Sequence, residues 1–144
     1  MAYATTTDMI DAFGEAEMIR LTAPEGGLDE AVVVVRAENA LADASATIDG
    51  YLRARYAVPL ADPPPREIAR ACRILARFDL AQGEQRSPSE SMTKERDGVI
   101  AWLRDVAAGR VDLDVPATPP GAATAGARVS DRVPAFTAGG GIGW

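Results

Sequence analysis

The fold of this 144-residue chain is decided by one stretch, Leu41-Ala42-Asp43-Ala44-Ser45-Ala46-Thr47-Ile48-Asp49-Gly50-Tyr51-Leu52. Apolar side chains recur in it at steps of three and four, which is the spacing of one face of an α-helix. The acidic side chains of Asp43 and Asp49 fall on the other side. The stretch therefore predicts a long amphipathic helix that turns one face toward a core.

The residues around this stretch predict where the long helix begins and ends. Asp29 is a suitable N-cap, because its carboxylate can accept hydrogen bonds from the first turn. The run Val32–Val35 favours strand by propensity, but no turn separates it from the helical pattern. We interpret it as the buried start of the same helix. We expect the helix to end near Tyr56, since Pro59 disfavours helical geometry before it.

Two short helices are expected before the long one. Thr6 or Thr7 can cap the first, which Gly14 ends, and the second covers residues 15–21. After the long helix, the prolines of Asp62–Pro65 form a rigid connector, and Pro64 or Pro65 can occupy the first position of the next helix. The apolar face of that helix comprises Ile68, Ala71, Cys72, Leu75 and Phe78.

A last helix is predicted to start near Ser89 or Ser91 and to stop at Gly109. Beyond it, residues 111–115 alternate apolar and acidic side chains, which predicts a short strand. The sequence thus predicts an all-α domain over residues 1–115. We expect a small helical bundle with a long central helix and a short strand after the last helix.

The remaining segment, residues 116–144, is rich in Pro, Gly, Ala and Thr and cannot bury enough apolar surface to fold alone. It nevertheless carries large apolar side chains between its small residues. We expect it to be an extended C-terminal tail that becomes ordered against a partner during assembly. The candidate anchors of the tail are Val133, Phe136, Ile142 and Trp144.

The composition excludes several classes of function. The formal net charge is −6, and an acidic chain does not attract DNA phosphates as clustered Lys and Arg do. The chain has no histidine and one cysteine, Cys72, so it lacks the commonest general base and cannot form an internal disulfide. No signal peptide or membrane span is visible. We expect a protein of the cytoplasm, or of a particle assembled there.

The remaining candidates for chemistry each have a simpler interpretation. Asp112 and Asp114 could hold Mg²⁺ or Ca²⁺ weakly, but they suit a solvated strand edge better. Three carboxylates at helical spacing near the start of the chain suit a helix N-terminus better than acid–base work. Cys72 lies on an apolar face, where it acts as a small hydrophobe. We therefore expect no enzyme, metal site or cofactor. The three carboxylates are Asp8, Asp11 and Glu15.

Four arginines of the helix predicted after the proline connector recur at helical spacing and share roughly one side. They could contact DNA, pair with acidic neighbours in an oligomer, or simply face solvent. The first possibility supports an alternative function, a helical DNA-binding or regulatory module. These arginines are Arg66, Arg70, Arg73 and Arg77.

Residues 1–115 resemble a known family. The most specific block contains Ile48-Asp49-Gly50-Tyr51-Leu52, Arg55-Tyr56 and Pro59-Leu60, and later matches include Ala101-Trp102-Leu103. This pattern is similar to the head–tail adaptor (connector, or head-completion) proteins of Mu-like tailed phages and gene transfer agents. One departure is Asp97, where members often carry an aromatic residue, and we expect it to weaken a core contact.

The resemblance implies a virion structural protein at the head–tail junction. It implies a homo-oligomeric, dodecameric ring between the portal protein and the stopper or tail terminator protein. Double-stranded DNA would pass through the lumen without sequence-specific binding, and no membrane would be involved. The tail anchors would dock on the portal or on a neighbouring subunit. The expected fold determinants of the motif are Ile48, Gly50, Tyr51, Leu52, Arg55, Tyr56, Pro59 and Leu60.

Overall fold

The computed structural model describes residues 2–23, 31–83 and 86–116, and these residues form helices and loops without a strand. The all-α prediction is therefore confirmed. The helices are α1 (Thr6–Phe13), α2 (Glu15–Thr22), α3 (Val34–Leu52), α4 (Arg66–Ala81) and α5 (Glu90–Ala107).

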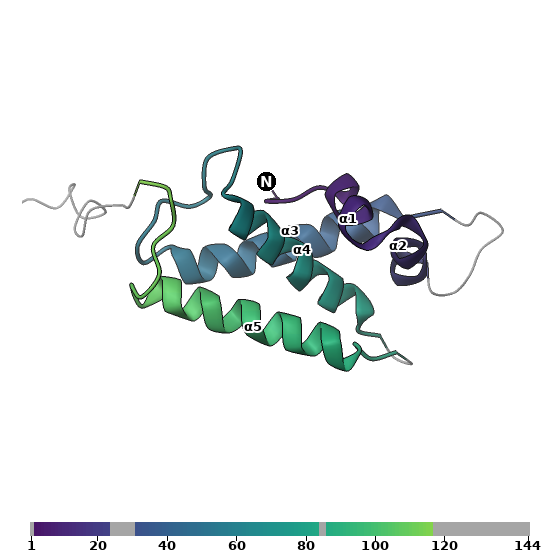
Figure 1. Cartoon of the computed structure of the whole chain (residues 1–144). Coiled ribbons are helices and arrows are strands. Elements are labelled where there is room, and N and C mark those ends of the chain that lie inside the picture. The colour runs from purple at the N-terminus through teal and green to yellow at the C-terminus, as the bar shows by residue number, and fades with distance from the viewer. Residues whose placement is uncertain (1, 24–30, 84–85, 117–144) are drawn as a thin grey trace, which may run out of the picture.

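The three long helices lie side by side, and each runs opposite to the one before it (Figure 1). The α3–α4 contact is the most extensive, and α5 packs against both of these helices. The short helices α1 and α2 cover the end of the bundle at which α3 begins (Figure 1). This is the small bundle with a long central helix that the sequence predicts.

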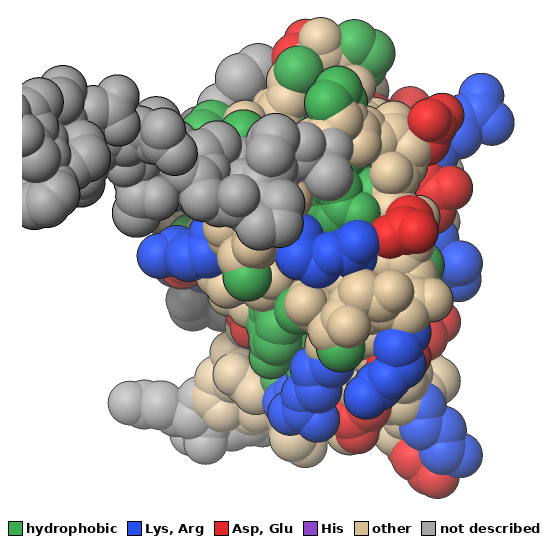
Figure 2. Space-filling model, turned by 90° about the vertical axis from the view of Figure 1, so that its left-hand side faces the viewer, with side chains coloured by type: hydrophobic (Ala, Val, Ile, Leu, Met, Phe, Trp, Pro, Cys, Tyr) green, Lys and Arg blue, Asp and Glu red, His purple; other side chains and the backbone are tan. Residues whose placement is uncertain are grey.

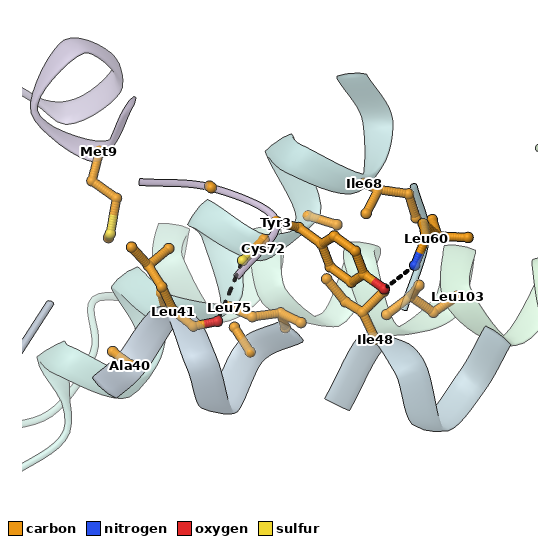
Figure 3. Close-up of a cluster of buried hydrophobic side chains, with 14 of the residues drawn as sticks. Tyr3, Met9, Ala40, Leu41, Ile48, Leu60, Ile68, Cys72, Leu75 and Leu103 are labelled. Carbon is orange, nitrogen blue, oxygen red and sulfur yellow. Dashed lines mark hydrogen bonds between the residues drawn. The ribbon is translucent and has the colours of Figure 1, made fainter. Parts of the chain in front are cut away.

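The core lies between these helices and is mostly aliphatic. Ile48 and Leu52 of α3, Ile68 of α4 and Leu103 of α5 are fully buried at its centre. Several of these side chains converge in Figure 3. Burying one such side chain contributes roughly 1.5–3 kcal/mol before ordering costs, so the predicted apolar faces account for the packing.

The helix starts differ in detail from those predicted. The side chain of Thr5, and not of Thr6 or Thr7, caps α1, and Asp8 completes a reciprocal capping box with it. A residue three positions before a carboxylate is the one that can close such a box. Pro65 is the N-cap of α4 instead of its first helical residue. Ser89, one of the two predicted starts of the last helix, caps α5.

The start of α3 contradicts the prediction of a buried valine run. The helix begins at Val34, and the exposed fractions of Val33, Val34 and Val35 are 36%, 49% and 64%. Consecutive helical residues are about 100° apart around the axis, so a run of valines cannot all face one core. The buried face of α3 begins at Ala37. The predicted cap, Asp29, lies outside the described residues.

The predicted end of the long helix and the predicted strand were also wrong. Helix α3 ends at Leu52, before a turn over residues 53–55, and not near Tyr56. Residues 111–115 form no strand. An alternating pattern becomes a strand only beside a second strand, whereas the N–H of Leu113 here donates to the Tyr56 hydroxyl.

Candidate functional site

Arg55 joins the end of α3 to the chain that follows α5. Its Nη1 donates to the carbonyl oxygens of Val106, at 2.8 Å, and Val111, at 3.2 Å. Its Nη2 donates to Oδ1 of Asp112 at 2.6 Å, and this bond raises the pKa of Arg55. The planar guanidinium, with several N–H donors in fixed directions, suits three acceptors on one curved segment.

Tyr56, the next residue, adds a buried contact to the same segment. Tyr56 is 3% exposed, and its hydroxyl accepts a hydrogen bond of 2.9 Å from the backbone N–H of Leu113. Leu113 itself belongs to the core. We call this set the exit clamp: Arg55 and Tyr56, with the Val106, Val111 and Leu113 backbone and the Asp112 carboxylate.

A glycine turns the chain into the exit clamp. Gly109 follows α5 with a φ of +82°, a left-handed conformation that side chains other than glycine rarely adopt. The sequence predicts a stop at this residue, and α5 ends at Ala107. The chain then bends back across Arg55, so the exit clamp holds residues 111–113 against the bundle.

A second tyrosine holds the loop between α3 and α4. The Tyr3 hydroxyl donates to the Asp49 carboxylate and accepts a hydrogen bond of 2.9 Å from the N–H of Leu60 (Figure 3). Its backbone N–H donates to Oγ of Ser45 at 3.0 Å. Burial, and then the bond to Asp49, raise the pKa of Tyr3 to about 12. The first residues of the chain are therefore part of the bundle.

The motif residues have different environments. Ile48, Leu52, Tyr56 and Leu60 are buried, and Tyr51 is half-buried. Gly50 and Pro59 are exposed. A Cβ added at Gly50 would have no neighbour within 4 Å. Sequence reasoning gave no role to Tyr3 or Ser45, because Tyr3 precedes the predicted helices and Ser45, although at helical spacing from Leu41 and Ile48, is polar.

The four arginines of α4 do not form one exposed stripe. Arg66 and Arg70 are exposed, but the side chain of Arg77 is only 17% exposed. Its guanidinium binds Glu17 of α2 at 2.7 Å and Glu95 of α5 at 3.2 Å. It also lies over the Phe13 ring, 4.5 Å from the centroid. Arg77 therefore fastens neighbouring helices to α4 and does not serve an outer surface.

A groove of about 430 Å³ lies between α4 and α5, and Arg70 is on its rim. We call it the α4–α5 groove. A smaller hollow beside it shares Arg70, Ile74 and Glu95 and reaches Phe13 of α1. The lining of the α4–α5 groove combines apolar and charged residues: Glu67, Arg70, Ala71, Ile74, Lys94, Glu95, Gly98, Val99 and Trp102.

Three of the candidates for chemistry, Asp8, Asp112 and Cys72, have structural contacts, whereas Asp11, Glu15 and Asp114 are exposed. Hydrogen bonds from the Thr5 backbone and hydroxyl lower the pKa of Asp8, which acts as a helix cap. The Asp112 carboxylate binds Arg55. Burial raises the pKa of Cys72, whose Sγ lies 3.3 Å from Oγ of Ser45. Within the described ranges, no group of three or more possible ligands could hold a metal ion.

The described surface has mixed charge. Asp112 of the exit clamp is 77% exposed, and Arg110 nearby in the chain pairs with Asp105. Figure 2 shows basic and acidic side chains next to one another on one face of the molecule. No described helix is long and apolar enough to cross a membrane. The predicted tail anchors Val133, Phe136, Ile142 and Trp144 lie outside the described residues.

Comparison with known proteins identifies the family. The family model described as Bacteriophage Mu, Gp36 matches residues 3–131 of this chain. The chain belongs to the bacteriophage Mu Gp36 family. The match includes the whole exit clamp and continues past residue 115, where the resemblance was expected to end.

Two relatives support this membership. The Gp36-family chain is 38% identical over 118 residues to "Gene product J" of Escherichia phage Mu. The match covers 80% of this chain and 78% of that protein. It is also 37% identical over 86 residues to "Mu-like prophage FluMu protein gp36" of Haemophilus influenzae. This match covers 60% of this chain and 55% of that protein. The resemblance to Mu-like phage proteins is thereby confirmed.

The departure at Asp97 does not affect the core of this Gp36-family chain. The Asp97 side chain is 59% exposed and pairs with Arg96 at 2.8 Å. The Arg96 guanidinium covers the Phe78 ring at 4.4 Å from its centroid. The expectation of a weakened core contact was wrong, because this position lies at the surface of α5.

Proposed function

We propose that this chain is a structural subunit of a head–tail connector and not an enzyme. Its copies form a dodecameric ring between the portal protein and the stopper or tail terminator protein of a Mu-like phage or gene transfer agent. Double-stranded DNA passes through the lumen of the ring. The ring belongs to the head–tail junction of the virion.

The exit clamp is the observation that carries this proposal. In a chain of a phage Mu family, two adjacent motif residues, Arg55 and Tyr56, fix the root of the C-terminal segment by four hydrogen bonds. A fixed root aims the segment that follows in one direction, which reduces the ordering cost of docking. This arrangement suits a protein that reaches for a neighbour.

The segment beyond the exit clamp has a composition suited to that task. Residues 117–144 carry two arginines, one aspartate and four candidate apolar anchors among small residues. Burying one large apolar side chain is worth roughly 1.5–3 kcal/mol before ordering costs. In a ring, each subunit repeats this weak contact, so the copies together bind strongly. We propose that the anchors dock on the portal protein.

The charge of the chain supports passage of DNA through the ring in preference to binding of DNA by the ring. The net charge of −6 opposes retention of phosphates. Arg77, one of the four candidate DNA contacts, is already bound by Glu17 and Glu95. A DNA-binding or regulatory module remains the alternative, since Arg66 and Arg70 are exposed. Duplex binding that weakens steeply with salt, and weakens again in Arg70→Ala, would favour that alternative.

The direct test is head–tail joining by particles that carry variant chains. Replacing Phe136 and Trp144 with serine should leave DNA-filled heads without tails in electron micrographs, because the apolar docking energy is lost. Replacing Thr124 with serine is the matched control within the same segment, and these particles should join normally. Normal joining by the double variant, or by chains cut after residue 116, would contradict the docking role.

A further inference from the structure

The α4–α5 groove is an apolar hollow between two walls of balanced charge. Val99 and Trp102 of α5 are only partly buried in it, beside Ile74 of α4. Its volume of about 430 Å³ falls within the roughly 300–1,000 Å³ of typical binding pockets. An occupant of this groove needs apolar side chains together with charges of both signs. Each wall supplies one acid and one base: Glu67 and Arg70 from α4, and Glu95 and Lys94 from α5.

One part of the C-terminal tail, residues 128–136, carries apolar side chains suited to the groove, and we call it the docking segment. It reads Arg-Val-Ser-Asp-Arg-Val-Pro-Ala-Phe and contains two of the predicted anchors, Val133 and Phe136. Pro134 lies between them and limits the backbone conformations of the segment. Fewer conformations lower the ordering cost of docking. Two anchors this close together can therefore bind in one hollow.

The charges of the docking segment match those of the groove. Asp131 is the only acidic residue of the tail, and Arg128 and Arg132 precede and follow it. Two bases and one acid suit a lining with two glutamates, an arginine and a lysine, because each charge can take an opposite neighbour. Among the described residues, the ion pairs include neither Glu67 nor Arg70, so both are open to such a neighbour.

The docking segment is within reach of the groove of its own chain. The exit clamp holds the chain beside the last turn of α5, at one end of the bundle (Figure 1). Lys94 lies about 20 Å before the end of α5, at 1.5 Å per residue. An extended chain from Pro116 to Asp131 covers up to about 50 Å. With Asp131 beside Lys94, Phe136 reaches Trp102, which lies about 12 Å further along the same helix.

The tether favours the groove of the same chain over other sites. A linker that can span two sites gives the linked segment an effective concentration of about 1 mM. Subunits dissolved at micromolar concentration compete poorly with a site supplied at that concentration. Docking would also cover apolar side chains that otherwise promote association. The groove of the same chain is thus the favoured place for the anchors before assembly.

We propose that in the free chain the docking segment lies in the α4–α5 groove of its own chain. Asp131 then lies beside Lys94, and Phe136 lies against Trp102. The contact keeps the anchors covered until a portal ring binds them, and each subunit exchanges its own groove for the portal protein. The release rests on the proposed function, whereas the contact in the free chain does not.

The single lysine allows a direct test on the free full chain. Lys94 carries the only side-chain amine of the sequence, and Asp131 carries the only side-chain carboxylate of the tail. A carbodiimide joins an amine to a carboxylate that touches it, and mass spectrometry locates the product. The product between Lys94 and Glu90, which are 3.0 Å apart, is the internal control. We expect a second product, which joins Lys94 to Asp131.

A double variant tests whether the apolar anchors hold this contact. Val133→Ser with Phe136→Ser keeps both coupling partners and changes no described residue, so the helical circular dichroism should stay unchanged. The yield of the Lys94–Asp131 product, relative to the internal control, should fall at least about fivefold because the apolar burial is lost. Thr124→Ser is the matched control and should keep the yield. An unchanged yield in the double variant would contradict the proposal.

Trp102 gives a second readout that needs no coupling. The chain has two tryptophans, so Trp144→Phe leaves Trp102 as the only indole. Acrylamide should quench its fluorescence at least about twofold faster once Val133→Ser and Phe136→Ser are added, since a docked segment excludes water from the groove. Equal quenching with and without these two changes would show that the docking segment does not cover Trp102.

Isotope labels and portal rings separate the remaining outcomes. In a mixture of unlabelled and heavy-nitrogen-labelled chains, Lys94–Asp131 products of mixed label would assign the docking segment to another copy and overturn the proposal. Absence of this product, where the internal control forms, would overturn it as well. Copies bound to portal rings should lose the product, and its persistence there would contradict the release. Portal rings that bind no copies would overturn the proposed function and leave the contact in the free chain supported.

Discussion

Arg55 and Asp112 are 57 residues apart in the sequence, yet their side chains form an ion pair of 2.6 Å. The pair joins the turn after α3 to the segment after α5, and Tyr56 binds the same segment one residue later. The bundle is thus closed at the point where its C-terminal segment begins. The first and last described parts of the chain meet the α3–α4 loop, through Tyr3 and through the exit clamp.

The two members of the Arg55–Asp112 pair should contribute unequally to stability. Arg55 also donates to two carbonyl oxygens, whereas Asp112 is 77% exposed and has one described partner. Asp112→Asn should change the free energy of unfolding by less than about 1 kcal/mol. Arg55→Ala should lower it several times further, because two acceptors lose their donor. Urea unfolding measures both, and equal effects would contradict the carbonyl contacts of the exit clamp.

Tyr3 should make stability fall in alkaline solution. Its pKa is raised from 10.0 to about 12, so the folded state holds the phenolic proton more tightly than the unfolded state. The contribution is fully present below pH 10 and is lost as the pH rises through about 12. In Tyr3→Phe the phenolate absorbance step near pH 12 should vanish, and the free energy of unfolding should fall by about 1–2 kcal/mol. An unchanged titration curve would show that the step belongs to another group.

Arg77 should matter more to the fold than the other arginines of α4. Arg77→Leu leaves Glu17, whose side chain is 21% exposed, without its cation and removes the contact with Phe13. We expect a loss of about 1–3 kcal/mol, and a loosened α1–α2 region in hydrogen exchange. Arg70→Leu, at an exposed position of the same helix, is the control and should cost less than about 0.5 kcal/mol. Equal losses would argue against the interhelical role.

The thiol of Cys72 should be protected by the fold. It is fully buried, and burial raises its pKa, so little thiolate exists to react. A thiol reagent should label the folded chain at least about 1000-fold more slowly than the urea-unfolded chain, since labelling requires opening of the core. Rapid labelling under native conditions would show that α3 and α4 separate readily.

The sequence alone predicted the helices well, because periodic apolar spacing is a local property. The faces of α3 and α4 that carry Ile48 and Ile68 are buried as expected. Prediction failed where the outcome depends on a distant neighbour. Val33, Val34 and Val35, expected to be buried, are exposed at the start of α3. Residues 111–115, expected to form a strand, meet Arg55 and Tyr56.

The candidate site was less predictable than the fold, for a physical reason. A helical wheel gives the direction of Arg77 but not what covers that direction, which is the pair α1 and α2. Tyr3 and Leu60 meet across 57 residues, and no local pattern signals this contact. Only the resemblance to a family pointed to Arg55 and Tyr56, and it could not name their partners.

The central claim is that many copies of this chain bind a portal ring through the C-terminal segment. The most direct measurement is the native mass of purified portal rings mixed with the full chain, and with a chain that ends at residue 116. We expect about a dozen bound copies of the full chain and none of the shortened chain at the same concentration. A portal mass unchanged by the full chain would show that this chain is not a portal-bound subunit.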